Sequence, residues 1–137
     1  MKGDFIMNFE KFTIKSQEAI QKAVEIAQNG GQQAIETAHL LKGVMLAGEG
    51  VCKFLFAKLG VNAQVLSQAV DSQIQSYPKV KGGNPYFSNE TSKVLDKAVS
   101  LSDKDGHSFV PLEMILMALL TVNNGVQSML KNAGFTE

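Results

Sequence analysis

The sequence contains no arginine and no tryptophan, and its 13 cationic residues are all lysines. The bidentate guanidinium contacts that serve phosphate sites and arginine fingers are therefore excluded within this chain. Thirteen acidic residues balance the lysines, so the formal net charge is zero. A dedicated nucleic-acid-binding domain needs a clear basic excess, and the composition argues against one.

Cysteine and long apolar runs are also scarce. The single cysteine, Cys52, excludes an internal disulfide and a multi-thiolate metal site, and it suits a reducing compartment. The longest apolar run, from Met114 to Leu120, is much shorter than the roughly 18 residues that a membrane span needs. We therefore predict a soluble, cytoplasmic domain without a membrane partner. Residues 1–7 are interpreted as an N-terminal extension or start.

The sequence does contain an internal repeat. When it is shifted by 75 residues, residues 12–55 align without a gap on residues 87–130, with nine identities in 44 positions. Apolar residues replace one another at many further positions, and this preserved pattern predicts two copies of one structural unit. We expect one domain, 8–137, that comprises repeat one (12–77), a connector (78–86) and repeat two (87–137).

Each repeat has the periodicity of short helices with recognisable ends. Thr13, Ser88 and Asn62 stand where N-caps belong, and Gly60 and Gly134 stand where helices end. No stretch alternates convincingly as a strand. We therefore predict an all-α fold, a tandem pseudo-twofold repeat of a four-helix unit. We also expect the last helix of repeat two to be missing. The predicted helices span residues 14–28, 38–46, 51–59 and 63–77, then 89–104, 111–122 and 126–132.

The repeat suggests which apolar residues are exposed. Phe56 aligns with Lys131, and Met117 aligns with Lys42. A position that is apolar in one copy and charged in the other is typical of a surface. Phe56 and Met117 therefore either form apolar surface that binds another protein or line the contact between the two halves.

Catalytic chemistry has little support in the residues. Cys52 aligns with Gln127, which places it on a rim rather than in a catalytic pocket. A nucleophilic pair of Cys52 and His39 is conceivable, and a small helical enzyme that uses these residues or His107 is a third interpretation. No convergent set of groups favours it. One cysteine and two histidines are also too few for a zinc site without carboxylate help.

Four short motifs in a fixed order point to a family. They open the first helix, open the second helix, follow the third helix and begin the connector. The chain resembles the amino-terminal domain of Clp ATPases, and among these most closely the ClpB-type AAA+ disaggregases. The motifs are Phe12–Ala19, Thr37–Leu41, Gly60–Asn62 and Tyr77–Val80.

The resemblance implies a non-catalytic accessory domain without a cofactor or metal of its own. It implies downstream AAA+ modules that use ATP and magnesium, a homohexameric parent, and a DnaK-type chaperone system as partner. The domain would engage unfolded or aggregated polypeptide. The alternative is the N-domain of a Clp protease unfoldase, which docks adaptor proteins.

The resemblance also implies a polypeptide-binding site. Thr13 and Glu113 match its polar residues, although an N-cap and a helix dipole also explain them. His107 stands where many members carry Asp, and Lys97 stands where the groove has leucine, which makes this groove less apolar. The candidate site residues are Thr13, Lys97, Leu101, His107, Glu113 and Met114.

Overall fold

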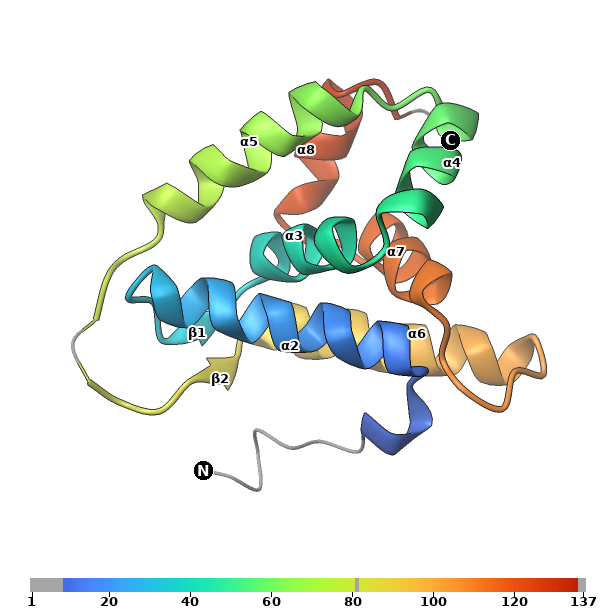
Figure 1. Ribbon diagram of the computed structural model, residues 1–137, viewed down its shortest axis with the longest axis horizontal. Helices are drawn as coiled ribbons and strands as arrows, with labels where there is room; N and C mark the ends of the chain where they lie inside the picture. The colour runs from blue at the N-terminus through green and yellow to red at the C-terminus, as the bar shows by residue number, and fades with distance from the viewer. Residues whose placement is uncertain (1–8, 81, 136–137) are drawn as a thin grey trace.

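The computed structural model describes residues 9–80 and 82–135, and its helices pack as two related halves (Figure 1). The expected extension, residues 1–7, lies outside the described residues. Four α-helices form the first half, and the described part of the second half contains three, which confirms the all-α prediction. The elements are η1 (Phe9–Lys11), α2 (Ile14–Asn29), β1 (Ala34–Ile35), α3 (Thr37–Ala47), α4 (Glu49–Leu59), α5 (Ala63–Ser76), β2 (Tyr86–Phe87), α6 (Asn89–Lys104), α7 (Leu112–Thr121) and α8 (Val126–Asn132).

The helix starts follow from the predicted caps. The Thr13 hydroxyl accepts a hydrogen bond from the Ser16 N–H at 3.1 Å, and the Ser88 hydroxyl accepts one from the Thr91 N–H at 3.2 Å. Asn62 caps α5 through its side-chain oxygen. Each cap satisfies N–H groups that have no partner inside the helix. These caps explain why the predicted starts of α2 and α6 agree with the structure.

The core lies around α3 and α7, whose residues are mostly buried. Helix α2 packs across α3, and α6 packs across α7. The first crossing is the closer one at Gly43, where an added Cβ would lie 2.3 Å from the Ala19 carbonyl oxygen and 3.0 Å from the Ala23 nitrogen. The repeat aligns Gly43 with the buried Ala118, so the second crossing accommodates a methyl group that the first does not.

A short parallel pairing occurs twice and relates the two halves. Phe87 of β2 pairs with Ile35 of β1, and Phe12 pairs with Val110 through an isolated bridge. The 75-residue shift converts one pair into the other. These strands could not be predicted, because two residues are too few to show alternation. Each half therefore holds the start of the other half's first helix.

The structure corrects two predictions from the repeat. Cys52 and Phe56 are each only 3% exposed, so Cys52 is not on a rim, and of the two interpretations of Phe56 the exposed surface is wrong. Met117 is 45% exposed, which agrees with its interpretation as apolar surface.

The error has a single cause, a one-residue offset before the third helix of the second half. Helices α4 and α8 are followed by the left-handed glycines Gly60 and Gly134, which are 74 rather than 75 residues apart. Phe56 therefore corresponds to the buried Leu130 and not to the exposed Lys131.

Candidate functional site

The start of α2 is fastened to the segment that joins α6 to α7 (Figure 1). The Thr13 N–H donates to the Val110 carbonyl at 3.1 Å, and the Ser16 hydroxyl donates to the same oxygen at 2.9 Å. Val110 precedes Glu113 by three residues, and Glu113 is exposed in the first turn of α7. The structure therefore brings Thr13 and Glu113, which are 100 residues apart in sequence, to one end of the molecule.

The other predicted site residues lie on α6, on α7 or between them. Leu101 in the last turn of α6 and Met114 in the first turn of α7 are half-buried and pack against the core. His107 is exposed on the connecting loop. Lys97 is exposed on α6 and lies about one helical turn before Leu101.

Two exposed apolar residues, Ile14 and Phe109, were missed by the sequence analysis. They are the neighbours of Thr13 and Val110, and they are 78% and 55% exposed. The repeat contained the signal, because Ile14 aligns with Asn89 and Phe109 aligns with the small Ala34. We name this surface the junction face. Its members are Thr13, Ile14, Leu101, His107, Phe109, Glu113 and Met114.

The buried histidine has a structural role. His39 Nδ1 accepts a hydrogen bond from the Glu36 N–H at 2.9 Å, and because a backbone N–H can only donate, Nδ1 carries no proton. His39 Nε2–H therefore donates to Gln32 Oε1 at 2.8 Å. Burial lowers the pKa of His39 to about 4, so the ring is neutral. Gln32 in turn donates to the Ile74 carbonyl, which links α3 to the end of α5.

Cys52 is also unsuited to nucleophilic chemistry. Its thiol donates to the Val44 carbonyl at 3.6 Å, and burial raises its pKa to about 11. A thiol of this kind holds almost no thiolate at neutral pH, and the thiolate is the reactive form. The ring nitrogens of His39 are bonded to other groups. These contacts argue against the interpretation as a Cys–His enzyme.

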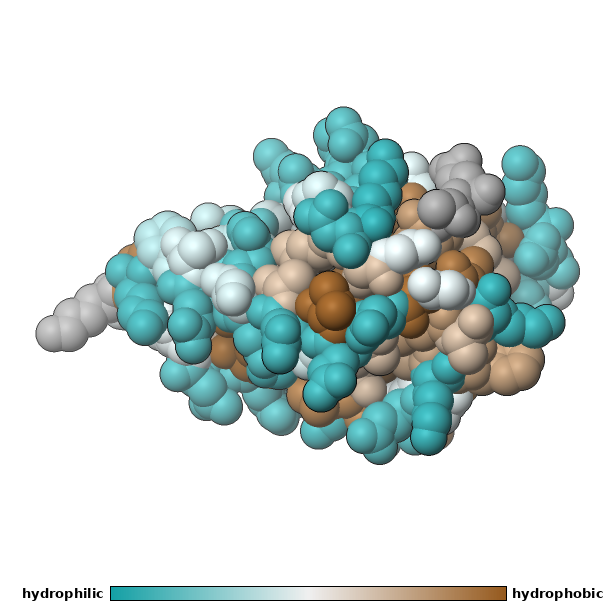
Figure 2. Space-filling view, turned by 90° about the horizontal axis from the view of Figure 1, so that it is seen from above, coloured by the Kyte–Doolittle hydropathy of each residue, from teal (hydrophilic) through white to brown (hydrophobic). Residues whose placement is uncertain are grey.

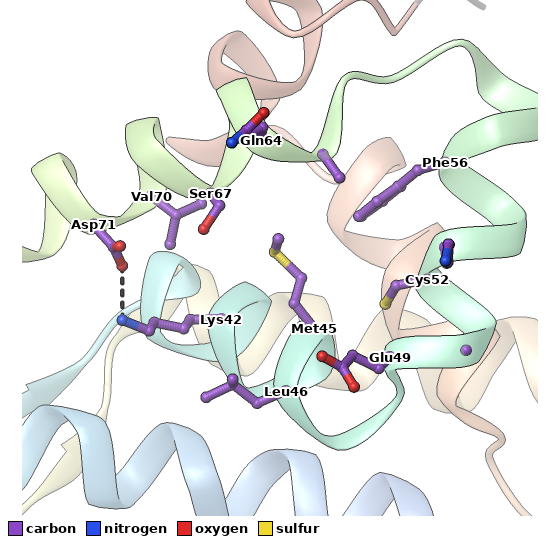
Figure 3. A pocket seen from close by; sticks show the side chains of 13 residues that line it. Lys42, Met45, Leu46, Glu49, Cys52, Phe56, Gln64, Ser67, Val70 and Asp71 are labelled. Atoms are coloured by element: carbon purple, nitrogen blue, oxygen red, sulfur yellow. Dashed lines mark hydrogen bonds and ion pairs between the residues drawn. The ribbon is translucent and has the colours of Figure 1, made fainter.

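A separate pocket of about 690 Å³ opens between α3, α4 and α5, and none of the predicted site residues lines it. Met45, Cys52 and Phe56 point toward this space (Figure 3). Lys42 Nζ and Asp71 Oδ1, 2.7 Å apart, join α3 to α5 at its edge. Figure 2, which views the molecule from above Figure 1, shows apolar residues near the centre of that face and hydrophilic residues around them.

Metal sites and membrane-spanning helices are both absent from the described ranges. Residues 9–80 and 82–135 contain no group of three or more His, Cys, Asp or Glu side chains placed to hold a metal ion. Within the same ranges, none of the helices has the length and apolar character to cross a bilayer.

Thr13 allows a test that separates capping from ligand contact. We expect Thr13→Ala to lower the free energy of unfolding by about 1 kcal/mol, since it removes the acceptor for the Ser16 N–H. Thr13→Ser should retain most of that stability, because the second half uses Ser88 at the equivalent cap. Urea unfolding of both variants measures this. Equal destabilisation by Ala and Ser would show that capping is not the role of this hydroxyl.

Comparison with known proteins identifies the family. The chain matches the Clp repeat N-terminal domain over residues 11–133. It is 57% identical to the chaperone protein ClpB of Bacteroides thetaiotaomicron and 48% identical to that of Porphyromonas gingivalis, over 131 residues each. Both alignments cover 96% of this chain, which spans about 15% of the length of these relatives.

Solved structures agree on the fold. The N-terminal domain of Hsp104 from Candida albicans superposes with a TM-score of 0.81 at 21% identity, over 92% of this chain and 83% of that one. The N-terminal domain of ClpD from Arabidopsis thaliana gives 0.74 at 26% identity, over 95% and 89%. Since the family match covers nearly the whole sequence, the chain belongs to the family of Clp repeat N-terminal domains.

Proposed function

We propose that this domain is the substrate-engaging N-terminal accessory domain of an ATP-dependent protein disaggregase, and that it binds unfolded or aggregated polypeptide weakly. The similarity to two ClpB chaperones supports the choice of parent. The observation that carries the binding role is the junction face, in which Ile14 and Phe109 are exposed and Leu101 and Met114 are half-buried.

The physical basis is the hydrophobic effect. Unfolded chains expose apolar side chains, and burial of this area against Ile14 and Phe109 releases roughly 25 cal/mol per Å². Because the junction face is small and the loss of chain freedom opposes binding, the affinity should be low. His107 and Glu113 add hydrogen-bonding groups at the margin of the face. Low affinity suits a domain that passes its substrate on.

In this proposal the rest of the parent protein supplies the ATP-dependent activity and the several copies of the domain. We propose a cytoplasmic homohexamer whose downstream AAA+ modules bind ATP and magnesium and which cooperates with a DnaK-type chaperone system. Six tethered copies of a weak site raise the effective concentration of binding sites for one long substrate. Weak individual binding and firm overall capture are therefore compatible.

The binding role predicts a selective effect of junction-face variants. Ile14→Ser and Phe109→Ser should each weaken binding of reduced, carboxymethylated α-lactalbumin by about threefold to tenfold, because each removes exposed apolar contact area. Fluorescence anisotropy of the labelled, permanently unfolded protein measures this. Phe54→Ser is the matched control, since Phe54 is 61% exposed on α4, outside the junction face.

The control outcomes decide between the two candidate functions. Folded α-lactalbumin should not bind, and Phe54→Ser should bind the unfolded protein as the parent sequence does. Equal loss in the Phe54 and Phe109 variants would contradict a localised site. If the unfolded protein does not bind at all, substrate engagement is wrong and adaptor docking, the role of a protease unfoldase N-domain, takes its place.

A further inference from the structure

The first half of the molecule already binds another segment of the chain, its own connector, through two N–H groups that are six residues apart. The Val80 N–H donates to the Gly31 carbonyl at 2.8 Å, and the Tyr86 N–H donates to the Gln33 carbonyl at 3.1 Å. The Gln33 side-chain amide donates back to the Asn84 carbonyl at 3.0 Å. The loop after α2 therefore acts as a docking edge for the backbone of another segment.

The loop after α6 has the same backbone conformation. Gly31 and Gly106 are both left-handed, with φ of 72° and 78°. The Gly31 N–H donates to the Gln28 carbonyl at 3.0 Å, and the Gly106 N–H donates to the Asp103 carbonyl at 3.1 Å. Gly31 aligns with Gly106 and Gln28 aligns with Asp103 when the sequence is shifted by 75 residues. The second half therefore presents the same kind of edge.

Among the described residues, two carbonyl groups at the edge of the second half accept no hydrogen bond. The carbonyls that correspond to those of Gly31 and Gln33 belong to Gly106 and Ser108. Within residues 9–80 and 82–135, neither accepts a hydrogen bond. The Val110 end of this edge is occupied by Phe12 and Thr13. An incoming backbone would therefore meet Gly106 and Ser108, which are neighbours of His107 and Phe109 of the junction face.

We propose that the second half binds a polypeptide segment along Gly106–Ser108, in the way that the first half binds the connector. The segment donates two backbone N–H groups to the Gly106 and Ser108 carbonyls. This inference rests on the proposed function and names its mode of recognition. Backbone hydrogen bonds are shared by all sequences, so such an edge suits a domain whose substrates differ in sequence.

The first half also indicates the favoured side chain. The Tyr77 ring lies against His39, with ring centroids 5.3 Å apart, three residues before the Val80 hydrogen bond. The repeat replaces His39 by the half-buried Met114 in the second half. A thioether packs well against aromatic rings. We therefore expect preference for an aromatic residue three positions before the bonded amide.

A synthetic peptide with the connector sequence, residues 76–87, is the probe. Added to the ¹⁵N-labelled full chain, it should shift the amide signals of residues 106–109 and of Met114. N-methylation at the position of Val80 removes one donor and should weaken binding about fivefold, the value of one backbone hydrogen bond of roughly 1 kcal/mol. N-methylation at the position of Lys79 is the control, because the Lys79 N–H makes no hydrogen bond among the described residues. This control should change affinity less than twofold.

Each other outcome overturns the inference. Equal effects of the two N-methylated peptides would mean that backbone donors do not contribute. Shifts confined to residues 31–35 would mean that the peptide only exchanges with the connector. Shifts of residues 106–109 that depend on protein concentration, without peptide, would identify a second copy as the occupant. If unfolded α-lactalbumin still binds in these cases, the proposed function stands and only its backbone mode is wrong.

Discussion

Gly43→Ala should lower the free energy of unfolding by about 1–2 kcal/mol. The new Cβ would lie 2.3 Å from the Ala19 carbonyl oxygen, so α2 and α3 would have to move apart through their buried crossing. Overpacking of this kind costs roughly 1–3 kcal/mol, and a cost near the upper end outweighs the gain of about 1 kcal/mol in helix propensity. At roughly 4 °C per kcal/mol, the melting temperature should fall by about 4–8 °C.

Gly50→Ala is the matched control for this prediction. Gly50 lies in α4, and a Cβ there would meet no atom within 4 Å. The same change in composition should therefore leave stability unchanged or raise it by up to about 1 kcal/mol. Calorimetry of both variants makes the comparison. If Gly43→Ala melts as high as Gly50→Ala, then α2 and α3 do not cross as closely as described.

The second large effect is acid lability caused by His39. Its pKa of about 4 in the folded protein lies below the ordinary 6.5 of the unfolded chain. The unfolded state therefore binds the proton more readily between these values. The stability that His39 provides is complete above about pH 6.5 and is lost as the pH falls toward 4. This difference between the two pKa values corresponds to a loss in the free energy of unfolding on the order of 3 kcal/mol.

Comparison of the two histidines isolates this effect. His107 is exposed, so His107→Gln should keep the pH dependence of the parent sequence. His39→Gln should lower stability at pH 7, because it disturbs the bonds to Glu36 and Gln32, and should flatten the stability profile between pH 6.5 and 4. Urea unfolding at several pH values measures both. Identical slopes for the two variants would contradict the neutral, buried His39.

The helices could be predicted because their ends are encoded locally. A cap such as Thr13 or Asn62 acts within three residues, and Gly60 ends α4 through its own left-handed backbone. The predicted spans of α2, α3 and α6 differ from the observed ones by a single residue at most at each end. Local chemistry and apolar period agree in these segments, which makes such boundaries readable.

The wrong predictions, for Cys52 and Phe56, depended on how the two repeats align with each other. The ungapped repeat paired Cys52 with Gln127, whereas the offset in the second half pairs it with the buried Val126. The hydrogen bonds that close the third helices, from Val61 to Phe56 and from Phe135 to Leu130, show the same 74-residue spacing. The sequence held one sign of the offset, because the helix-ending glycines Gly60 and Gly134 are 74 residues apart and not 75.

The candidate site was predictable only in part. The family resemblance indicated Leu101 and Met114. In the structure, Leu101 lies in the last turn of α6 and Met114 in the first turn of α7. The exposed Ile14 and Phe109 were missed because exposure of a single apolar residue is common. The hydrogen bond from Thr13 to Val110 joins the two segments that carry them, and only the structure shows this bond.

The most direct test of the central claim is an amide NMR titration of the ¹⁵N-labelled chain with reduced, carboxymethylated α-lactalbumin, with the folded protein as control. We expect weak, saturable shifts confined to residues 13–14, 101–109 and 113–114, seen only with the unfolded protein. Shifts spread evenly over both halves, or clustered around Met45 and Phe56 in the pocket between α3, α4 and α5, would contradict the claim that the junction face binds substrate.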